Sequence, residues 1–345
     1  MQYAPVIIPT LNRDAHLKRC LDSLAANSVA AQTDLYISVD YPPAPKYVPG
    51  YERVKALLQD YDFSRFKSHH ILYQSENLGP SANSRLLERV VSEFSDAVIY
   101  TEDDNEFSPN FLEYLNKGFE EFSDDERVVF LCGSPNTEWY YADDANVTMT
   151  KLLAAYGMGY RLSRRARFNE QANEYLLDRR NWTIRNFARL YRRNGIMFWM
   201  YISGILCSEK NIYWEDSRHI HFCDTPTSIY MHYSDYGCIC PRIPKSRTFG
   251  NDGSGVNMPA MTCNREVELD KAHTFEYVYP KDFSFNPDNY RLGDEYMRAE
   301  LKKSTCVWLK IFTAWIMAVM ISLFKSRSLP LFIRRSALRI KGLFS

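Results

Sequence analysis

Apolar and polar positions follow two different periods along the first hundred residues. Four runs rich in β-branched and aromatic residues are typical of buried parallel strands; they are Pro5–Thr10, Leu35–Val39, His70–Gln74 and Val98–Thr101. Three amphipathic stretches lie between them, with apolar residues at helical spacing; they are His16–Ala26, Glu52–Tyr61 and Ser81–Phe94. Strands that alternate with helices at these intervals predict a parallel, doubly wound α/β sheet.

The second half of the chain has a less regular pattern. Apolar runs predict strands at Val128–Gly133 and Cys238–Ile243, and Pro226–Tyr236 has helical character. Two arginine-rich stretches, Arg161–Arg167 and Arg179–Arg193, are interleaved with aromatic residues. They are either solvated helix faces or a surface for a phosphate-bearing acceptor.

Length and charge exclude some classes of function. A chain of 345 residues forms one large or two modest domains. Its 42 basic and 42 acidic residues balance, so no nucleic-acid partner is expected. Neither GxGxxG nor GxxxxGK[ST] occurs in the first half, which argues against ordinary dinucleotide or P-loop binding. The eight cysteines suggest reduced thiols, and we expect no signal peptide before the first strand.

Three carboxylates follow the fourth predicted strand. Glu102, Asp103 and Asp104 end that strand, and Ser108 with Pro109 then predicts the start of a helix. Acidic side chains at the carboxyl end of a central parallel strand lie where open α/β sheets bind ligands. Such oxygen ligands suit Mg²⁺ or Mn²⁺. The alternative is an acidic surface turn, since exposed carboxylates are common.

Several motifs, in order, resemble GT-A-fold glycosyltransferases. The opening strand and turn through Arg13 look like bacterial polysaccharide glycosyltransferases, and Asp40 closes the second strand. Glu102-Asp103-Asp104, followed by Pro109–Tyr114, looks like the N-acetylglucosaminyltransferase I group. The resemblance implies that Asp40 faces the nucleoside, Arg13 lies near the nucleotide, and Asp104 ligates Mn²⁺ or Mg²⁺ together with Glu102. The other residues assigned to donor binding are Pro9, Asn12, Asn77, Gly79, Asn83, Asp103 and Arg247.

The chemistry of sugar transfer agrees with that assignment. A nucleotide-sugar donor loses a negatively charged diphosphate, which a divalent cation held by one or two carboxylates stabilises. A glycosidase would need two carboxylates that flank the sugar from separate elements, and three adjacent acids cannot do so.

The resemblance places the catalytic base on Asp224. In the family an aspartate opens a helix and is followed by a strand with proline, which Pro241 matches. The carboxylate of Asp224 would take the proton of the acceptor hydroxyl. The family's tryptophan is replaced by Cys223, and Trp214-Glu215-Asp216 is a competing match. Asp224 as a simple helix cap is the third interpretation.

The resemblance implies a role for two further segments. The loop Arg247–Gly255 would close over the donor diphosphate. The Gly-x-Gly-aromatic sequence within Ala155–Ser163 would be a strand beneath the acceptor, the alternative being an ordinary strand with a bulge. His219, His221 and Cys223 lack the usual zinc spacing, so we expect them to be packed side chains.

The last 45 residues differ in charge from the rest. No Asp or Glu follows Glu300, whereas nine Lys or Arg do. Val307–Phe324 is an apolar stretch at the lower edge of spanning length, and Leu329–Phe344 mixes apolar with cationic residues. This composition favours a helix on an anionic membrane surface. The alternative is a helix packed on the catalytic domain.

The sequence therefore predicts a GT-A domain over residues 1–300, with a nucleotide-binding half (1–122) and an acceptor half (123–300), and a membrane-associating tail over 301–345. The expected activity is inverting, metal-dependent transfer of a hexose or N-acetylhexosamine, with UDP as the expected nucleotide. The acceptor is a glycan or lipid-linked oligosaccharide of surface polysaccharide biosynthesis, at the cytoplasmic face of the membrane. The alternatives are a sugar nucleotidyltransferase and a non-catalytic glycan-binding or scaffold protein.

Overall fold

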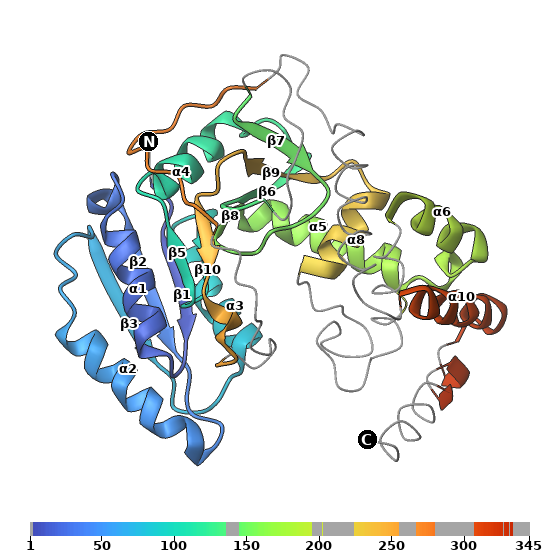
Figure 1. The fold of residues 1–345 in the computed structure, drawn as a ribbon, viewed down its shortest axis with the longest axis horizontal. Coiled ribbons are helices and arrows are strands. Elements are labelled where there is room, and N and C mark those ends of the chain that lie inside the picture. The colour runs from blue at the N-terminus through green and yellow to red at the C-terminus, as the bar shows by residue number, and fades with distance from the viewer. Residues whose placement is uncertain are drawn as a thin grey trace.

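A computed structural model gives the fold of the chain (Figure 1). The structure describes residues 3–135, 145–194, 202, 224–254, 267–279, 307–326, 328–330 and 332–333. Everything below refers to these residues.

An eight-stranded sheet forms the centre of the molecule, in the order β3-β2-β1-β4-β8-β6-β9-β7. Its strands are β1 (Val6–Thr10), β2 (Asp34–Val39), β3 (Ser68–Tyr73), β4 (Ala97–Tyr100), β6 (Val128–Cys132), β7 (Val147–Thr150), β8 (Met158–Arg161) and β9 (Gly237–Pro241). The first four strands are mutually parallel, β8 and β7 run antiparallel to their neighbours, and β6 is parallel to β9. The predicted mostly parallel α/β sheet is therefore confirmed.

Alternation along the strands explains why helices cover both faces of the sheet. Successive side chains of a strand point to opposite faces, so Val6 and Ile8 lie in one apolar cluster and Ile7 in the other. The first cluster is completed by α1 (Asp14–Ala25), α2 (Val48–Asp60) and α4 (Phe111–Glu121). The second contains residues of α3 (Pro80–Ser92), α5 (Leu162–Leu177), α6 (Ile184–Asn194), α8 (Asp224–Tyr233) and α10 (Val307–Phe324). The result is a doubly wound, three-layered fold.

Two short strands form a separate ribbon that the sequence pattern did not predict. β5 (Asn105–Phe107) directly follows the acidic triplet and pairs antiparallel with β10 (Ser246–Thr248). The segment starting at Arg247 is thus partly strand, followed by a 3₁₀ turn at Gly250–Asp252, where a loop was predicted.

The predicted start of the helix after the triplet was wrong. α4 begins at Phe111, and its N-cap position is Asn110 rather than Ser108. The first turn is capped from elsewhere in the chain, because the Leu112 amide donates to Asn27 Oδ1 at 2.8 Å. Ser108 is used differently: its hydroxyl donates to Asn110 Oδ1 at 2.8 Å.

The arginine-rich stretches prove to be helical, and their aromatic residues are core residues. Trp182 and Phe187 are buried in the second apolar cluster. Arg164 is also buried, and it donates to the carbonyl oxygens of Phe122 and Val128 among others. Its role is to close the turn between α4 and β6.

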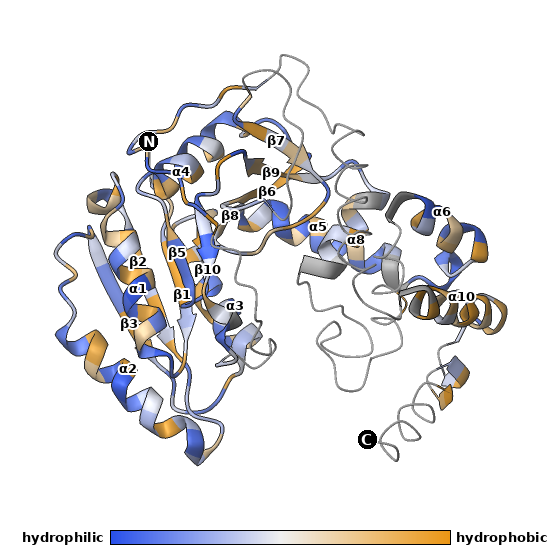
Figure 2. Cartoon of the chain, viewed as in Figure 1, coloured by the Kyte–Doolittle hydropathy of each residue, from blue (hydrophilic) through white to orange (hydrophobic). Residues whose placement is uncertain are grey.

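α10 is apolar around most of its circumference (Figure 2). Even so, no helix among the described residues is long and apolar enough to cross a bilayer.

Candidate functional site

The carboxyl ends of β1, β2 and β4 bring the predicted residues to one edge of the sheet. Thr10 ends β1 opposite Val39 of β2, and β1 is parallel to β4 on its other side. Asp40 follows β2 directly, and the acidic triplet follows β4. Parallel strands that end together build the crevice in which α/β proteins bind ligands.

Two carboxylates of the triplet share one guanidinium. Arg13 donates from Nη1 to Asp104 Oδ2 at 2.8 Å and from Nη2 to Asp103 Oδ1. The hydroxyl of Thr10 donates to the second oxygen of Asp103 at 2.7 Å. Asp103, Asp104 and Thr10 are buried. The site is therefore a pair of converging acids with a single positive charge between them.

The local environment shifts the pKa of Asp103, Glu102 and Arg13. Burial raises the pKa of Asp103, and the charge of Arg13 and the Thr10 hydrogen bond offset only part of that effect. Glu102 reaches solvent at the rim of the site. Its pKa is nevertheless raised to about 7, first because the surrounding protein removes water from the carboxyl group, and then because Asp104 and Asp103 are negatively charged. Burial alone would lower the pKa of Arg13; the two aspartates outweigh it and raise that pKa. The triplet thus has more acid than its one counter-ion neutralises.

The ribbon of β5 and β10 places a loop over the triplet. The Phe249 amide donates to the Asp104 carbonyl oxygen at 2.7 Å, which continues the pairing of Thr248 with Asn105. Gly250 comes so close that a Cβ atom there would lie 2.2 Å from Asp104 Oδ2. Only glycine fits so close to the Asp104 carboxylate. The position of the loop and the position of that carboxylate therefore depend on each other.

Arg247, predicted to bind the donor diphosphate, is held at the edge of this loop. Its guanidinium pairs with Glu106 of β5, 2.6 Å away, and donates to the Val267 carbonyl oxygen at 3.2 Å. At the other end of the loop, His16 Nε2 lies 3.2 Å from Asp252 Oδ2. Glu106 and His16 were not among the predicted site residues.

Asp40, predicted to face the nucleoside, organises the loop after β3. Its two carboxylate oxygens accept hydrogen bonds from the amides of Leu78 and Gly79 at 2.8 and 2.9 Å, and from Asn77 Nδ2 at 3.1 Å. Gly79 then starts α3 with a φ of +77°, which favours glycine. Three predicted donor residues therefore form one hydrogen-bonded unit.

The remaining predicted donor residues lie nearby. Asn83 is buried on the first turn of α3, where it accepts from the Ser38 hydroxyl and donates to the Ser38 carbonyl oxygen at 3.1 Å. Pro9 lies within β1, and Asn12 is in the turn between β1 and α1. No contact among the residues that the structure describes tests the roles of Pro9 and Asn12, which stay predictions.

The residues predicted for proton transfer can be placed only in part. The backbone of Asp224 forms the first residue of α8, as expected for an aspartate that opens a helix, and β9 with Pro241 follows. The side chain of Asp224 lies outside the described residues, as do Asp216, His219, His221 and Cys223. The choice between Asp224 and Asp216 therefore remains a prediction.

Two further residues near the triplet, Thr10 and Cys20, were missed by the sequence interpretation. Thr10 could have been found, because it ends β1 beside the strand that precedes Asp40. Cys20 could not, since it lies on α1 and its thiol reaches the Glu102 carbonyl oxygen, 3.7 Å away, only in the folded chain. Burial, and then the charges of Asp103 and Asp104, raise the pKa of Cys20 well above its usual range, so this thiol stays protonated.

The donor set fits the predicted Mn²⁺ or Mg²⁺. Asp103 and Asp104 already converge on one cationic group, and Glu102 is near enough for their charges to raise its pKa. Crowded carboxylate oxygens with excess negative charge are what a hard divalent cation requires. Arg13 would have to release at least one of the two aspartates to a bound ion.

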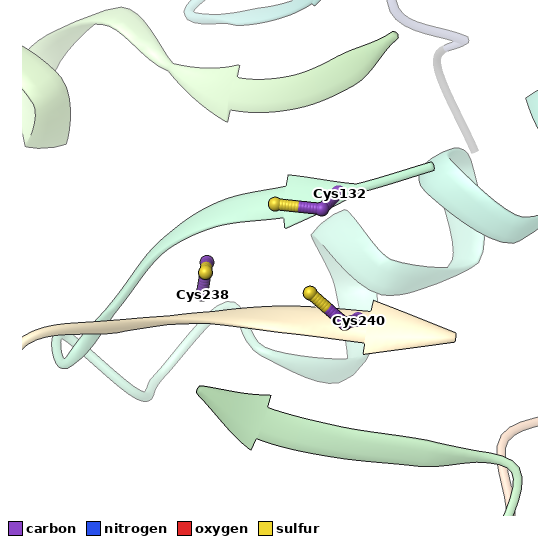
Figure 3. A group of neighbouring side chains, drawn as sticks. All are labelled: Cys132, Cys238 and Cys240. Atoms are coloured by element: carbon purple, nitrogen blue, oxygen red, sulfur yellow. The ribbon is translucent and has the colours of Figure 1, made fainter. Parts of the chain in front are cut away.

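Three cysteines form a second cluster of side chains of a kind that could bind a metal, but they are part of the hydrophobic core. Cys132 on β6 and Cys238 and Cys240 on β9 bring their sulfur atoms within 4.8 Å of one another (Figure 3). All three thiols are buried in an apolar cluster, and Cys238 donates to the Leu152 carbonyl oxygen at 3.1 Å. Neighbouring strands place these residues on one face of the sheet, and buried cysteine packs as a small apolar side chain.

Comparison with known proteins gives partial similarities to solved structures. No family model matches the sequence, and no curated protein matches it. Mannosyltransferase PcManGT from Pyrobaculum calidifontis, in complex with GDP-Man and Mn²⁺, is 12% identical with a TM-score of 0.32, over 49% of this chain and 46% of that protein. S. aureus TarS is 15% identical with a TM-score of 0.31, over 49% of this chain and 29% of that protein. The chain thus spans less than half of either structure.

Proposed function

We propose that this protein is a metal-dependent glycosyltransferase that moves a hexose or N-acetylhexosamine from a nucleotide-sugar donor, UDP-linked, to a hydroxyl acceptor with inversion. The observation that carries the proposal is the convergence of the Asp103 and Asp104 carboxylates on one guanidinium, that of Arg13, at the carboxyl end of β4. Asp40 lies at the end of β2, two strands from β4 in the same sheet, as a donor that spans nucleoside and diphosphate would require. The acceptor class that we propose is a glycan or lipid-linked oligosaccharide of surface polysaccharide biosynthesis.

The diphosphate end of the donor would lie at the triplet. Asp104 and Glu102 would hold Mn²⁺ or Mg²⁺, which when bound neutralises charge on the leaving diphosphate. Arg13 is within reach of the same oxygens and is free to turn to a phosphate once one aspartate is released. Gly250 and its neighbours would cover the diphosphate and exclude water from it.

The nucleoside end would lie against the unit formed by Asp40 and the loop 77–79. The hydrogen bonds from Asn77, Leu78 and Gly79 hold the Asp40 carboxylate in a fixed position. The same carboxylate also accepts from the Tyr41 amide at 2.9 Å, so each of its oxygens already takes two hydrogen bonds. Asp40 would therefore act by holding the loop 77–79 in place against the nucleoside.

Asp224 is the proposed general base. Its backbone opens α8, and the N-terminus of a helix is a position that favours a negative charge. The carboxylate would accept the proton of the acceptor hydroxyl as the oxygen forms its bond to the anomeric carbon, and the bond to the diphosphate breaks on the opposite side. Attack from the side opposite the leaving group inverts the anomeric centre.

The test begins with donor binding. A thermal-shift screen of nucleotide sugars, each with and without Mn²⁺, should show stabilisation that needs both ligands. Asp104→Asn should abolish it, whereas Asp62→Asn, a matched change at an exposed carboxylate remote from the site, should not. Absence of stabilisation by every donor would contradict the proposal.

Hydrolysis of the donor then separates an enzyme from a binding protein. Slow release of nucleoside diphosphate in the presence of Mn²⁺ is expected from a transferase without its acceptor. Mn²⁺-dependent donor binding with no release, with or without added glycan acceptors, would instead favour a non-catalytic protein.

A further inference from the structure

Helix α10 has two apolar faces, and only one of them is covered by the fold. Ala314, Met317, Ala318 and Ile321 are buried and belong to the same cluster as one face of the sheet. Their spacing of three and four residues places them on one side of the helix. The helix is therefore packed on the domain, which was one of the two alternatives left open by the sequence.

The opposite side of α10 exposes a stripe of large apolar residues. They are Leu309, Phe312, Ile316, Val319 and Leu323. Leu323 is 73% exposed and Leu309 64%. Of the 17 large apolar side chains exposed in the described part of the chain, nine lie between residues 309 and 333. Such a concentration marks an interaction surface, whereas scattered exposed apolar residues do not.

Helix α6 lies beside α10 at the end of the molecule farthest from α1 and α2 (Figure 1). The rings of Tyr191 and Trp315 pack 5.5 Å apart, and the Ile184 amide donates to Ser322 Oγ at 3.0 Å. Lys325 Nζ, just after α10, donates to the Trp182 carbonyl oxygen at 2.5 Å. These contacts fix the two helices to each other.

The outer side of α6 carries a row of arginines. Phe187 and Leu190 are buried, whereas Arg185, Arg189 and Arg192 are exposed on the opposite side of the helix. Both helices bury one side in the same cluster, so their outer sides face away from the domain together. We call this surface, the apolar stripe of α10 with the arginine row of α6, the α6–α10 face.

Acidic residues are missing from the sequence around this face. Residues 179–208 contain six arginines and no Asp or Glu, and no Asp or Glu follows Glu300. The sequence therefore supplies apolar side chains and positive charge together.

We propose that the α6–α10 face docks on an anionic lipid surface. Apolar side chains beside a basic rim are what a helix needs to lie in the headgroup region, about 5–10 Å deep. The charge also favours an anionic lipid surface over a second copy of this chain, because residues 179–208 and those after Glu300 supply no acidic side chain with which the arginines of another copy could pair. The proposal does not depend on the sugar-transfer activity, since it uses none of the residues at the triplet.

The test measures sedimentation of the full chain with vesicles, because removing α10 would also remove part of the core. Binding is expected to vesicles of phosphatidylcholine mixed with phosphatidylglycerol, to be weaker with phosphatidylcholine alone, and to fall as salt is raised. Equal binding to both kinds of vesicle, or no binding to either, would overturn the proposal.

Two sets of variants identify the face. Phe312→Ser/Leu323→Ser should abolish binding, whereas the control Val48→Ser/Ile243→Ser, also at exposed apolar residues, should not. Arg185→Gln/Arg189→Gln/Arg192→Gln should weaken binding roughly 10²-fold. Its control, Arg53→Gln/Arg65→Gln/Arg89→Gln, removes the same charge from exposed positions elsewhere and should have little effect.

Two further measurements complete the test. Circular dichroism melting curves should be unchanged, because all the substituted side chains are exposed. Light scattering without lipid should show no self-association through the face. A dimer that Phe312→Ser/Leu323→Ser dissociates, together with absent vesicle binding, would assign the face to a second copy and overturn the proposal.

Discussion

Arg13 donates to Asp104 at 2.8 Å while its second terminal nitrogen binds Asp103, so the guanidinium occupies the place between the two carboxylates. A divalent cation must therefore compete with Arg13 for the same oxygens. Arg13→Ala should tighten Mn²⁺ binding in the absence of nucleotide by roughly tenfold, or ~1.4 kcal/mol.

Isothermal titration calorimetry of the nucleotide-free protein measures this effect. Arg53→Ala is the matched control, since Arg53 of α2 also pairs with an aspartate, Asp14, that is not part of the triplet. With nucleoside diphosphate present, the wild type should bind Mn²⁺ more tightly than Arg13→Ala, because Arg13 then gains a phosphate partner. The same Mn²⁺ affinity in wild type and Arg13→Ala would show that Arg13 does not compete for the site.

Glu102 should make the metal-free protein less stable as pH rises. Its carboxyl titrates near 4.5 when unperturbed and at about 7 in the folded protein. Between these values the folded state binds more protons, so stability is lost as pH rises from about 4.5 to about 7. Glu102→Gln, which cannot ionise, should melt above wild type at pH about 8 and equal to it at pH about 4. Melting curves in EDTA that differ equally at both pH values would contradict the shift.

Gly250 should tolerate no side chain. A Cβ atom would lie 2.2 Å from Asp104 Oδ2, so Gly250→Ala must displace either the loop or the carboxylate. We expect Mn²⁺-dependent nucleotide binding to weaken by roughly ten- to a hundredfold, with a stability loss of about 1–3 kcal/mol. Ser254→Ala, an exposed position in the same loop, is the control and should bind normally.

The prediction that Asp224 is the base can be tested against the alternative that it only caps a helix. Asparagine caps a helix as well as aspartate, so Asp224→Asn keeps any cap but removes the proton acceptor. Turnover should fall by roughly 10² to 10⁴-fold, with donor affinity and melting temperature nearly unchanged. Asp216→Asn, assayed alongside, should be near normal. The opposite pattern would assign the base to Asp216.

A buried ion pair should be essential to the stability of the domain. Lys245, with 2% of its side chain exposed, pairs with Asp270 and so ties residues 267–279 to the segment between β9 and β10. Asp270→Ala leaves that ammonium buried without its partner and should cost about 3–5 kcal/mol in urea unfolding. Lys245→Met/Asp270→Asn, which removes both charges, should recover most of the loss. A loss in the double variant as large as in the single one would show that the charge of Lys245 is not the cause.

The sheet could be predicted because its strands have a strong local signal. β1, β2 and β4 are apolar on both faces, and the helices between them have one apolar side each. Each of these elements can therefore be recognised from a few residues of sequence. β5 and β10 were not predicted, since strands of three residues have no measurable period. Their pairing joins residues about 140 positions apart, which no local pattern encodes.

The residues of the site could be predicted where they directly follow a strand, but their contacts with one another could not. Asp40 and the triplet follow apolar strands and can be found from that position alone. The competition of Arg13 for Asp103 and Asp104 depends on side-chain directions that only the folded chain shows. The start of α4 was misplaced for the same reason, because its cap is Asn27, 85 residues away.

The buried side of α10 has a consequence for how the chain is made. The strands of the sheet and the helices around them all precede α10 in the sequence, so the apolar cluster that it completes is synthesised before its cover. Until α10 arrives, the nascent chain presents the side chains that Ala318 and Ile321 will bury, a state prone to aggregation or chaperone binding. The cluster on the opposite side of the sheet waits for less of the chain, because α1, α2 and α4 are made between its strands and the segment around Phe275, which completes it, precedes α10. The two faces of one sheet should therefore mature at different times during translation.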